Sequence, residues 1–142
     1  MDIRDRIVIC RDYADMSRRA AEFFAEYIRS NPNAVLGLAT GSTPTEMYKR
    51  LVDEYCAGKL DFSGVTTFNL DEYYPMAPDH PQSYRYFMNT HLFDRVNINK
   101  ANTNVPDGLC ADPISYCAEY DRRIADAGGI DLQLLGVGKN GH

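Results

Sequence analysis

The sequence has no tryptophan, only four cysteines, and no apolar run near the ~20 residues needed to span a bilayer. The cysteines Cys10, Cys56, Cys110 and Cys117 form no C-x-x-C pair and fall in or beside expected helices and strands. We therefore expect buried, reduced thiols rather than disulfides or a thiolate zinc site. No set of Asp, His and Glu has the spacing of metal ligands, so we expect no metal site.

Signals for export and for nucleic-acid binding are also missing. Residues 1–6 lack the apolar core of a signal peptide, and with no membrane span we expect a cytoplasmic protein. The 15 basic residues are outnumbered by 20 acidic ones, giving a net charge of -5. Because a sequence-independent grip on nucleic acid needs a basic face, we expect no nucleic-acid partner.

What is present is enough apolar sequence for one core, arranged as alternating strands and helices. At 142 residues and 44% hydrophobic content, the chain fits a single domain. Apolar runs and helical periodicity predict strands at residues 7–10, 34–39, 65–69 and 130–135. They predict helices between these strands, with residues 94–108 mostly loop. The alternation predicts an α/β fold that is Rossmann-like, with a mostly parallel sheet and helices on both faces.

Apolar residues at helical spacing mark the expected core face of each helix. In the first helix they are Met16, Ala20, Phe23, Phe24, Tyr27 and Ile28, and in the last they are Ile114, Cys117, Ala118 and Ile124. Asp112 and Pro113 predict the start of that last helix.

The segment from Thr40 to Thr43 has the features of an anion cradle. It follows an apolar strand, and a Thr-x-x-Glu pattern predicts Thr43 as the helix N-cap, with Pro44 at the first helical position and Glu46 at the third. A helix start offers unpaired N–H groups and the positive end of the helix dipole, and Gly41 lets a ligand approach the backbone. Phosphate is the expected guest, although the same pattern also fits a plain helix cap.

Two further candidate segments also follow predicted strands. Asp71 and Glu72 come after the third strand, and His142 ends the loop that begins at Gly136. Since ligands collect at the carboxyl ends of parallel strands, we expect the three segments to meet at one edge. There, one of the two acids and the histidine could exchange protons with a ligand; solvated loop acids and a frayed terminus are the alternatives.

Two other patterns are less specific. Gly136 to Gly141 match the spacing G-x-G-x-x-G, but no helix and no acidic residue about 20 positions on follow, so we disfavour a dinucleotide site. Tyr73, Tyr74, Tyr84 and Tyr86 follow the acidic pair; packing is the default interpretation and a sugar-binding wall the alternative.

Taken together, these segments resemble the glucosamine-6-phosphate deaminase family. The matching stretches are Leu36 to Pro44, Thr67 to Tyr73, Pro81 to Tyr84 with Phe87 and Met88, and Leu135 to His142, in the family's order. The resemblance covers nearly the whole chain but only the larger N-terminal part of such an enzyme. We therefore expect one deaminase domain over residues 1–142, incomplete at its C-terminus after the fourth predicted strand.

The resemblance implies a reaction and a set of roles. Glucosamine 6-phosphate and water would give fructose 6-phosphate and ammonia, by aldose–ketose isomerisation and loss of ammonia, with no cofactor. Asp71 would carry a proton between C2 and C1, and His142 would assist ring opening, oriented by Asn140. The phosphate would bind at Thr40, Gly41, Ser42 and Thr43, and the backbone of Gly136 and Gly138 would line the substrate pocket.

Three other functions remain open at this point. A related sugar-phosphate isomerase or a phosphogluconolactonase would share the general fold, but matches Asn69 to Tyr73 less well. A non-catalytic regulator could keep the cradle as an effector site. The partner in each case is a small sugar phosphate, and the sequence is compatible with a homo-oligomer without predicting one.

Overall fold

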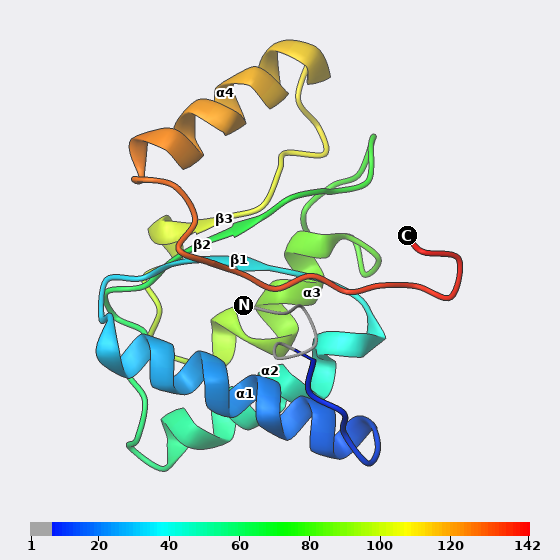
Figure 1. Ribbon diagram of the computed structural model, residues 1–142. Coiled ribbons are helices and arrows are strands. Elements are labelled where there is room, and N and C mark those ends of the chain that lie inside the picture. Colours follow the sequence, from blue (N-terminus) through cyan, green and yellow to red (C-terminus); the bar gives the residue numbers. More distant parts are fainter. Residues whose placement is uncertain (1–6) are drawn as a thin grey trace.

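A four-stranded parallel sheet forms the centre of the molecule (Figure 1). The computed structural model describes residues 7–142. Residues 1–6, from which the sequence predicts no signal peptide, lie outside the described residues. The strands are β1 (Val35–Leu38), β2 (Thr66–Asn69), β3 (Thr103–Asn104) and β4 (Leu132–Gln133). Their order in the sheet is β3-β2-β1-β4.

The helices cover both faces of this sheet, as the sequence predicted. They are α1 (Tyr13–Ser30), α2 (Ser42–Cys56), α3 (Tyr84–His91) and α4 (Pro113–Asp126), with short 3-10 turns at Phe93–Arg95 and Lys100–Asn102. Figure 1 shows α1, α2 and α3 on one face and α4 alone on the other. The α/β fold class is confirmed.

Alternating residues of the strands contribute side chains to two separate hydrophobic clusters, one on each face of the sheet. Leu36 and Leu38 point to the α1–α2–α3 side, where the larger buried cluster also contains Tyr48 and Phe62. On the other face, Val35 and Phe68 pack against Tyr120 of α4. The period-2 alternation of a strand thus gives each helical layer its own apolar surface.

The strand order places a reversal between β1 and β4. From β1 the chain moves outward through β2 to β3, and then returns through α4 to pair β4 with the opposite side of β1. In open parallel sheets the loops diverge at such a point and leave a crevice at the carboxyl ends of the strands. The fold therefore marks the end of β1 and β4 as the place for a ligand.

The start of α1 is fixed by two acids and a group of arginines. The Asp12 side chain accepts a hydrogen bond from the Asp15 N–H at 2.8 Å and forms the N-cap. The buried Asp15 carboxylate in turn pairs with Arg18 at 2.7 Å and lies 3.4 Å from Arg19. The hydrogen bond from Arg18, followed by one from the Arg11 N–H, lowers the pKa of Asp15 well below its usual range.

Asp15→Asn is expected to lower the melting temperature at pH 7. Because the Asp15 pKa is depressed in the folded state, its stabilisation is complete above the unfolded pKa of about 3.9 and is lost as the pH falls below it. The difference in melting temperature between the two proteins should therefore shrink towards acid pH, as followed by circular dichroism. Asp53→Asn, at an exposed pair with Lys49, is the control and should change little. Equal melting temperatures at pH 7 would contradict the role of Asp15.

The predicted first strand, at residues 7–10, is wrong for this structure. Ile7, Val8 and Ile9 are 63%, 63% and 89% exposed and form no strand. The segment pairs with no strand of the described sheet, and β propensity without a pairing partner does not make a strand. Conversely, β3 lies inside the stretch predicted as loop, because the two residues Thr103 and Asn104 pair with β2 and are too short to show a pattern.

Some predicted core positions are also exposed. In α4 the inner face is formed by Tyr116, Tyr120 and Ile124, whereas Ile114, Cys117 and Ala118 face outward. The reason is the Tyr120 hydroxyl, which donates to the Asn69 carbonyl at 2.6 Å and so sets the rotation of the helix. In α1, Phe23 is 61% exposed and Met16 is 37% exposed.

The four cysteines are free thiols, as predicted, but they are not all buried. Cys56 and Cys117 are exposed, and Cys10 and Cys110 are partly buried. The predicted burial is therefore wrong for Cys56 and Cys117, which lie on α2 and α4 with their side chains towards solvent.

Candidate active site

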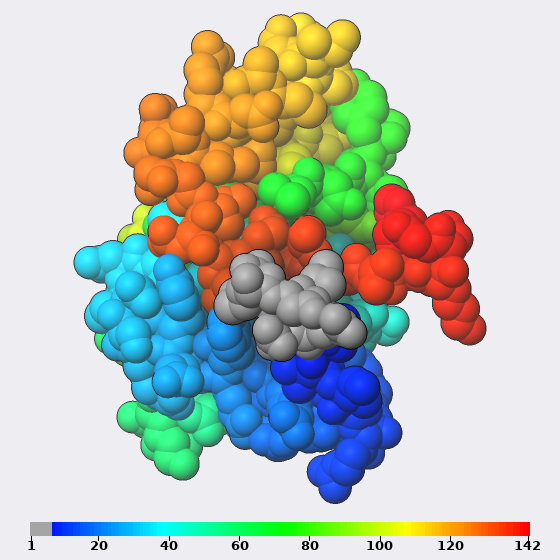
Figure 2. Space-filling model, in the orientation of Figure 1, coloured from blue at the N-terminus to red at the C-terminus, as the bar shows by residue number. Residues whose placement is uncertain are grey.

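Three connections converge at the carboxyl end of the sheet. They follow β1, β2 and β4, and in Figure 1 they lie together at the end towards which the strands point. Figure 2 shows the chain from residue 130 onward crossing between the α4 and α1 layers and ending in a projecting lobe at that edge. The predicted meeting of the three segments is thus seen in the fold.

The first connection turns into α2 earlier than predicted. The N-cap is Gly41, with φ of +100°, and not Thr43; the predicted capping box does not form. Glycine adopts this backbone conformation freely, which lets the helix begin two residues sooner. Glu46 instead pairs with Arg50 at 3.0 Å. Because Gly41 has no side chain, no capping group covers the first N–H groups of α2.

A cavity of about 750 Å³ opens at this edge. Its size lies within the range of small-molecule sites. It is lined from every side: by α1, by the end of β1, by the first turn of α2, by the connection after β2, by α3 and by the C-terminal segment. The lining residues are Met16, Ser17, Ala20, Leu38, Ala39, Thr40, Thr43, Pro44, Met47, Leu70, Asp71, Tyr84, Gln133, Leu134, Leu135, Gly136, Val137, Gly138 and His142.

Most of the residues predicted for the site line this one cavity. They are Thr40, Thr43, Asp71, Gly136, Gly138 and His142. Gly41 and Ser42 are exposed beside it on the first turn of α2 but do not line it, and Asn140 does not line it either.

Asp71 is the acid on the cavity wall. Its side chain is exposed to the open cavity, but desolvation by the surrounding protein, and next the negative charge of Glu72, raise its pKa above the ordinary value, while the charge of His142 lowers it. A carboxylate with a raised pKa binds and releases a proton more readily near neutral pH. The expectation that at most one member of the acidic pair faces the site fits this arrangement, since Glu72 does not line the cavity.

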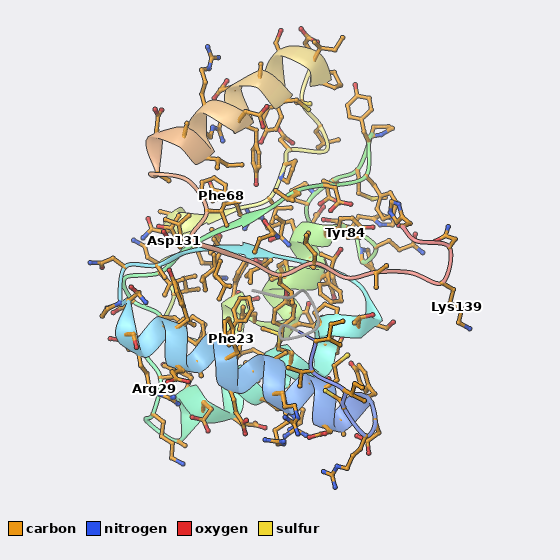
Figure 3. The ribbon with its side chains drawn as sticks, viewed as in Figure 1. Phe23, Arg29, Phe68, Tyr84, Asp131 and Lys139 are labelled. Atoms are coloured by element: carbon orange, nitrogen blue, oxygen red, sulfur yellow. The ribbon has the colours of Figure 1, made fainter. Side chains whose placement is uncertain are left out.

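His142 and Asn140 are joined through the backbone. The His142 N–H donates to Asn140 Oδ1 at 3.2 Å, and the Gly141 N–H donates to the Gly138 carbonyl at 2.9 Å. Asn140 therefore shapes the turn that carries His142 through a bond to the backbone of the histidine. In Figure 3, Lys139 points away from the molecule at the tip of this turn.

Tyr84, for which the sequence favoured packing and left a sugar-binding wall as the alternative, lines the cavity. Its ring lies 4.8 Å from that of Tyr73, and Figure 3 places it at the same end of the sheet as the C-terminal turn. A hydrogen bond with Tyr73, burial and the charge of Asp71 raise the pKa of Tyr84 to about 12.

Two tyrosine hydroxyls fix the backbone on either side of the Thr40–Thr43 segment by hydrogen bonds. The buried Tyr48 hydroxyl donates to the Ala39 carbonyl at 2.5 Å and accepts from the Ala39 N–H at 3.1 Å. The Tyr13 hydroxyl donates to the Ser42 carbonyl at 2.7 Å and accepts from the Glu46 N–H at 3.3 Å. The backbone between β1 and α2 is thus fixed at both of its ends.

Tyr48→Phe is expected to destabilise the protein by about 1–3 kcal/mol, because it leaves both polar groups of Ala39 without their partner. Chemical denaturation measures this. Tyr27→Phe is the control, since the Tyr27 ring packs at the edge of the core and its hydroxyl makes no such pair of bonds in the described part of the chain. If the two variants lost the same stability, the Tyr48 clamp would be refuted.

In residues 7–142, no three His, Cys, Asp or Glu side chains lie close enough to bind a metal ion together. In the same part of the chain, no helix combines the length and apolar character that crossing a membrane requires.

Comparison with known proteins places this site in a family. Residues 11–142 match the model of the glucosamine-6-phosphate isomerases/6-phosphogluconolactonase family. The chain belongs to this family. Curated proteins similar to this chain include the glucosamine-6-phosphate deaminases of Clostridium perfringens (strain SM101 / Type A) and Thermoanaerobacter sp. (strain X514), which are 58% and 52% identical to it over 137 residues.

Solved structures agree with that assignment. A monomeric glucosamine-6-phosphate deaminase superposes with a TM-score of 0.91 at 38% identity, over 94% of this chain and 55% of that one. A 6-phosphogluconolactonase from Thermotoga maritima superposes with a TM-score of 0.75 at 25% identity, over 96% and 61%. The two deaminase sequences are matched over 96% of this chain and over 57% and 54% of their own length. This family member therefore spans a little over half the length of those curated relatives.

Proposed function

We propose that this protein is a glucosamine-6-phosphate deaminase, which converts glucosamine 6-phosphate and water to fructose 6-phosphate and ammonia in the cytoplasm. The observation that carries the proposal is the cavity that unites an uncapped helix start with Asp71 and His142. The high identity to proteins named as deaminases supports the choice of substrate.

The phosphate would bind at the start of α2. Thr40 and Thr43 line the cavity there, and Gly41 and Ser42 supply backbone at the helix N-terminus. Positive helix dipole and free N–H groups suit a phosphate. Leu134 and Val137 form an apolar part of the cavity wall, against which the sugar carbons would lie next to Asp71.

Asp71 would act as the base of the isomerisation. It would take the proton from C2 of the opened sugar and return it to C1, which leaves an imine at C2. Water would add to that imine and ammonia would leave. His142, on the same wall, would assist opening of the ring, and the turn shaped by Asn140 would hold the histidine in place.

A phosphogluconolactonase is the alternative enzyme. It is disfavoured because the lactonase structure cited above is 25% identical to this chain, whereas the deaminase structure is 38% identical.

Purified full-length protein is incubated with glucosamine 6-phosphate or with 6-phosphogluconolactone. We expect ammonia and fructose 6-phosphate in equal amounts from the first substrate and no accelerated hydrolysis of the second. Hydrolysis of the lactone without ammonia release would favour the alternative enzyme. Binding of the amino-sugar phosphate without any product would favour a regulator.

A further inference from the structure

Glu72 follows Asp71 directly, yet its carboxylate is used up by contacts within the protein. Oε1 accepts hydrogen bonds from the N–H groups of Tyr73 and Tyr84, both at 2.9 Å. Oε2 accepts from Ser83 Oγ at 2.9 Å and from the Arg85 N–H at 3.0 Å. An ionised carboxylate has about four acceptor sites, so Glu72 has none left for a substrate.

The partners of Glu72 form the N-terminus of α3. Tyr84 and Arg85 are the first two residues of the helix, and Ser83 is its N-cap, with Oγ accepting from the Tyr86 N–H at 3.2 Å. Negative charge is favourable at this position because of the helix dipole. The anion-binding end of α3 is therefore filled by Glu72, whereas that of α2 has no capping side chain.

This arrangement ties two cavity residues together. Asp71 precedes Glu72 in the chain, and Tyr84 lies at the other end of the hydrogen-bonded bridge; both line the cavity. Moving the Glu72 side chain would release the connection after β2 and the first turn of α3 at once. A shift of about 1 Å in such a site is enough to lower a reaction rate strongly.

We propose that Glu72 is a positioning residue, which bridges the connection after β2 to the N-terminus of α3 and so holds Asp71 and Tyr84 in place for the reaction. The inference rests on the proposed function for its catalytic consequence, but the bridge itself is independent of that function. Arg85 extends the bridge to the sheet, since its guanidinium donates to Thr103 Oγ1 at 2.8 Å and to the Thr103 carbonyl at 3.0 Å.

The charge of Glu72 has a second effect, which separates its role from a merely structural one. It raises the pKa of Asp71; the other charged or titratable groups that interact with Asp71 are His142 and Tyr84. Removing the charge should lower the Asp71 pKa. Shortening the side chain while keeping the charge should not, although it should weaken the bridge.

Glu72→Gln and Glu72→Asp form the matched pair of variants. Amide hydrogen exchange at Tyr84 and Arg85 should speed up about tenfold or more in both, because hydrogen bonds to a charged acceptor are lost or lengthened. Carbon NMR titration of Asp71, assigned with Asp71→Asn, should show a lower pKa in Glu72→Gln and a much smaller change in Glu72→Asp. In turnover of glucosamine 6-phosphate, kcat should fall in both, and the acid limb of the pH profile should move to lower pH only in Glu72→Gln.

Unchanged amide exchange and an unchanged Asp71 titration in Glu72→Gln would overturn the inference. So would a wild-type protein that releases ammonia together with a Glu72→Gln variant of identical kcat and pH profile. If the wild type releases no ammonia, the proposed function fails, and the exchange and titration measurements still decide on the bridge. If Glu72→Gln does not fold, amide exchange in Glu72→Asp decides instead.

Discussion

Asp71→Asn is expected to lower kcat for glucosamine 6-phosphate by about 10²–10⁴-fold, the usual contribution of a positioned acid–base group. Asparagine keeps the size and polarity of the side chain but cannot take up the C2 proton. Because the phosphate would be held by the start of α2, on a different connection, the dissociation constant should change little. Steady-state kinetics and calorimetric titration measure the two quantities separately.

The control for this variant is Asp79→Asn. Asp79 is an exposed acid of the same connection after β2, and it does not line the cavity. It should retain the wild-type kcat. Full activity of Asp71→Asn would show that another group is the base.

Gly41→Ala is expected to raise KM for glucosamine 6-phosphate about tenfold or more, with a smaller effect on kcat. A methyl group at this position would touch nothing within 4 Å, so the effect comes from the backbone. With φ of +100° and ψ of -176°, Gly41 adopts a conformation that is essentially restricted to glycine and costs other residues about 1–3 kcal/mol. The backbone would relax and turn its N–H groups away from the phosphate, and each such bond to a charged group contributes about 1.5–3 kcal/mol.

Gly58→Ala is the matched control at the other end of α2. Gly58 also has a positive φ, of +71°, and open space around its Cβ position, but it follows the C-terminus of α2 and does not line the cavity. Both variants should lose stability in chemical denaturation, whereas only Gly41→Ala should lose substrate affinity. A normal KM for a folded Gly41→Ala protein would contradict phosphate binding at the start of α2.

The elements that the sequence predicted well are those whose signals are local. Asp112 with Pro113 marks the start of α4 through a side-chain hydrogen bond and the ring geometry of proline, and the structure has this start. The convergence of the three segments followed from the parallel sheet alone, because the carboxyl ends of parallel strands share an edge.

What the sequence missed depends on partners that are distant in the chain. β3 exists only because β2 pairs with it, and the rotation of α4 follows from the bond between Tyr120 and Asn69, which are 51 residues apart. Residues 7–10 have strand propensity but no neighbouring strand in the described chain. Propensity without a pairing partner does not decide the structure.

The site itself was predicted in position but not in detail. The capping box failed because glycine at residue 41 allowed an earlier helix start, which a side-chain pattern does not reveal. From the sequence, Asp71 and Glu72 were expected to point to opposite sides of an extended segment, but the sequence did not show which of them faces the site. That Glu72 binds the N-terminus of α3 requires knowledge of where that helix lies.

The most direct test of the central claim is a crystal structure of the full-length Asp71→Asn protein with glucosamine 6-phosphate bound. The claim is that a phosphate cradle and an acid–base group share one cavity at the carboxyl ends of β1, β2 and β4. We predict the phosphate at Thr40 to Thr43 against the backbone of Gly41 and Ser42, with the C2 hydrogen directed at residue 71. A phosphate bound elsewhere, or C2 directed away from residue 71, would contradict the account.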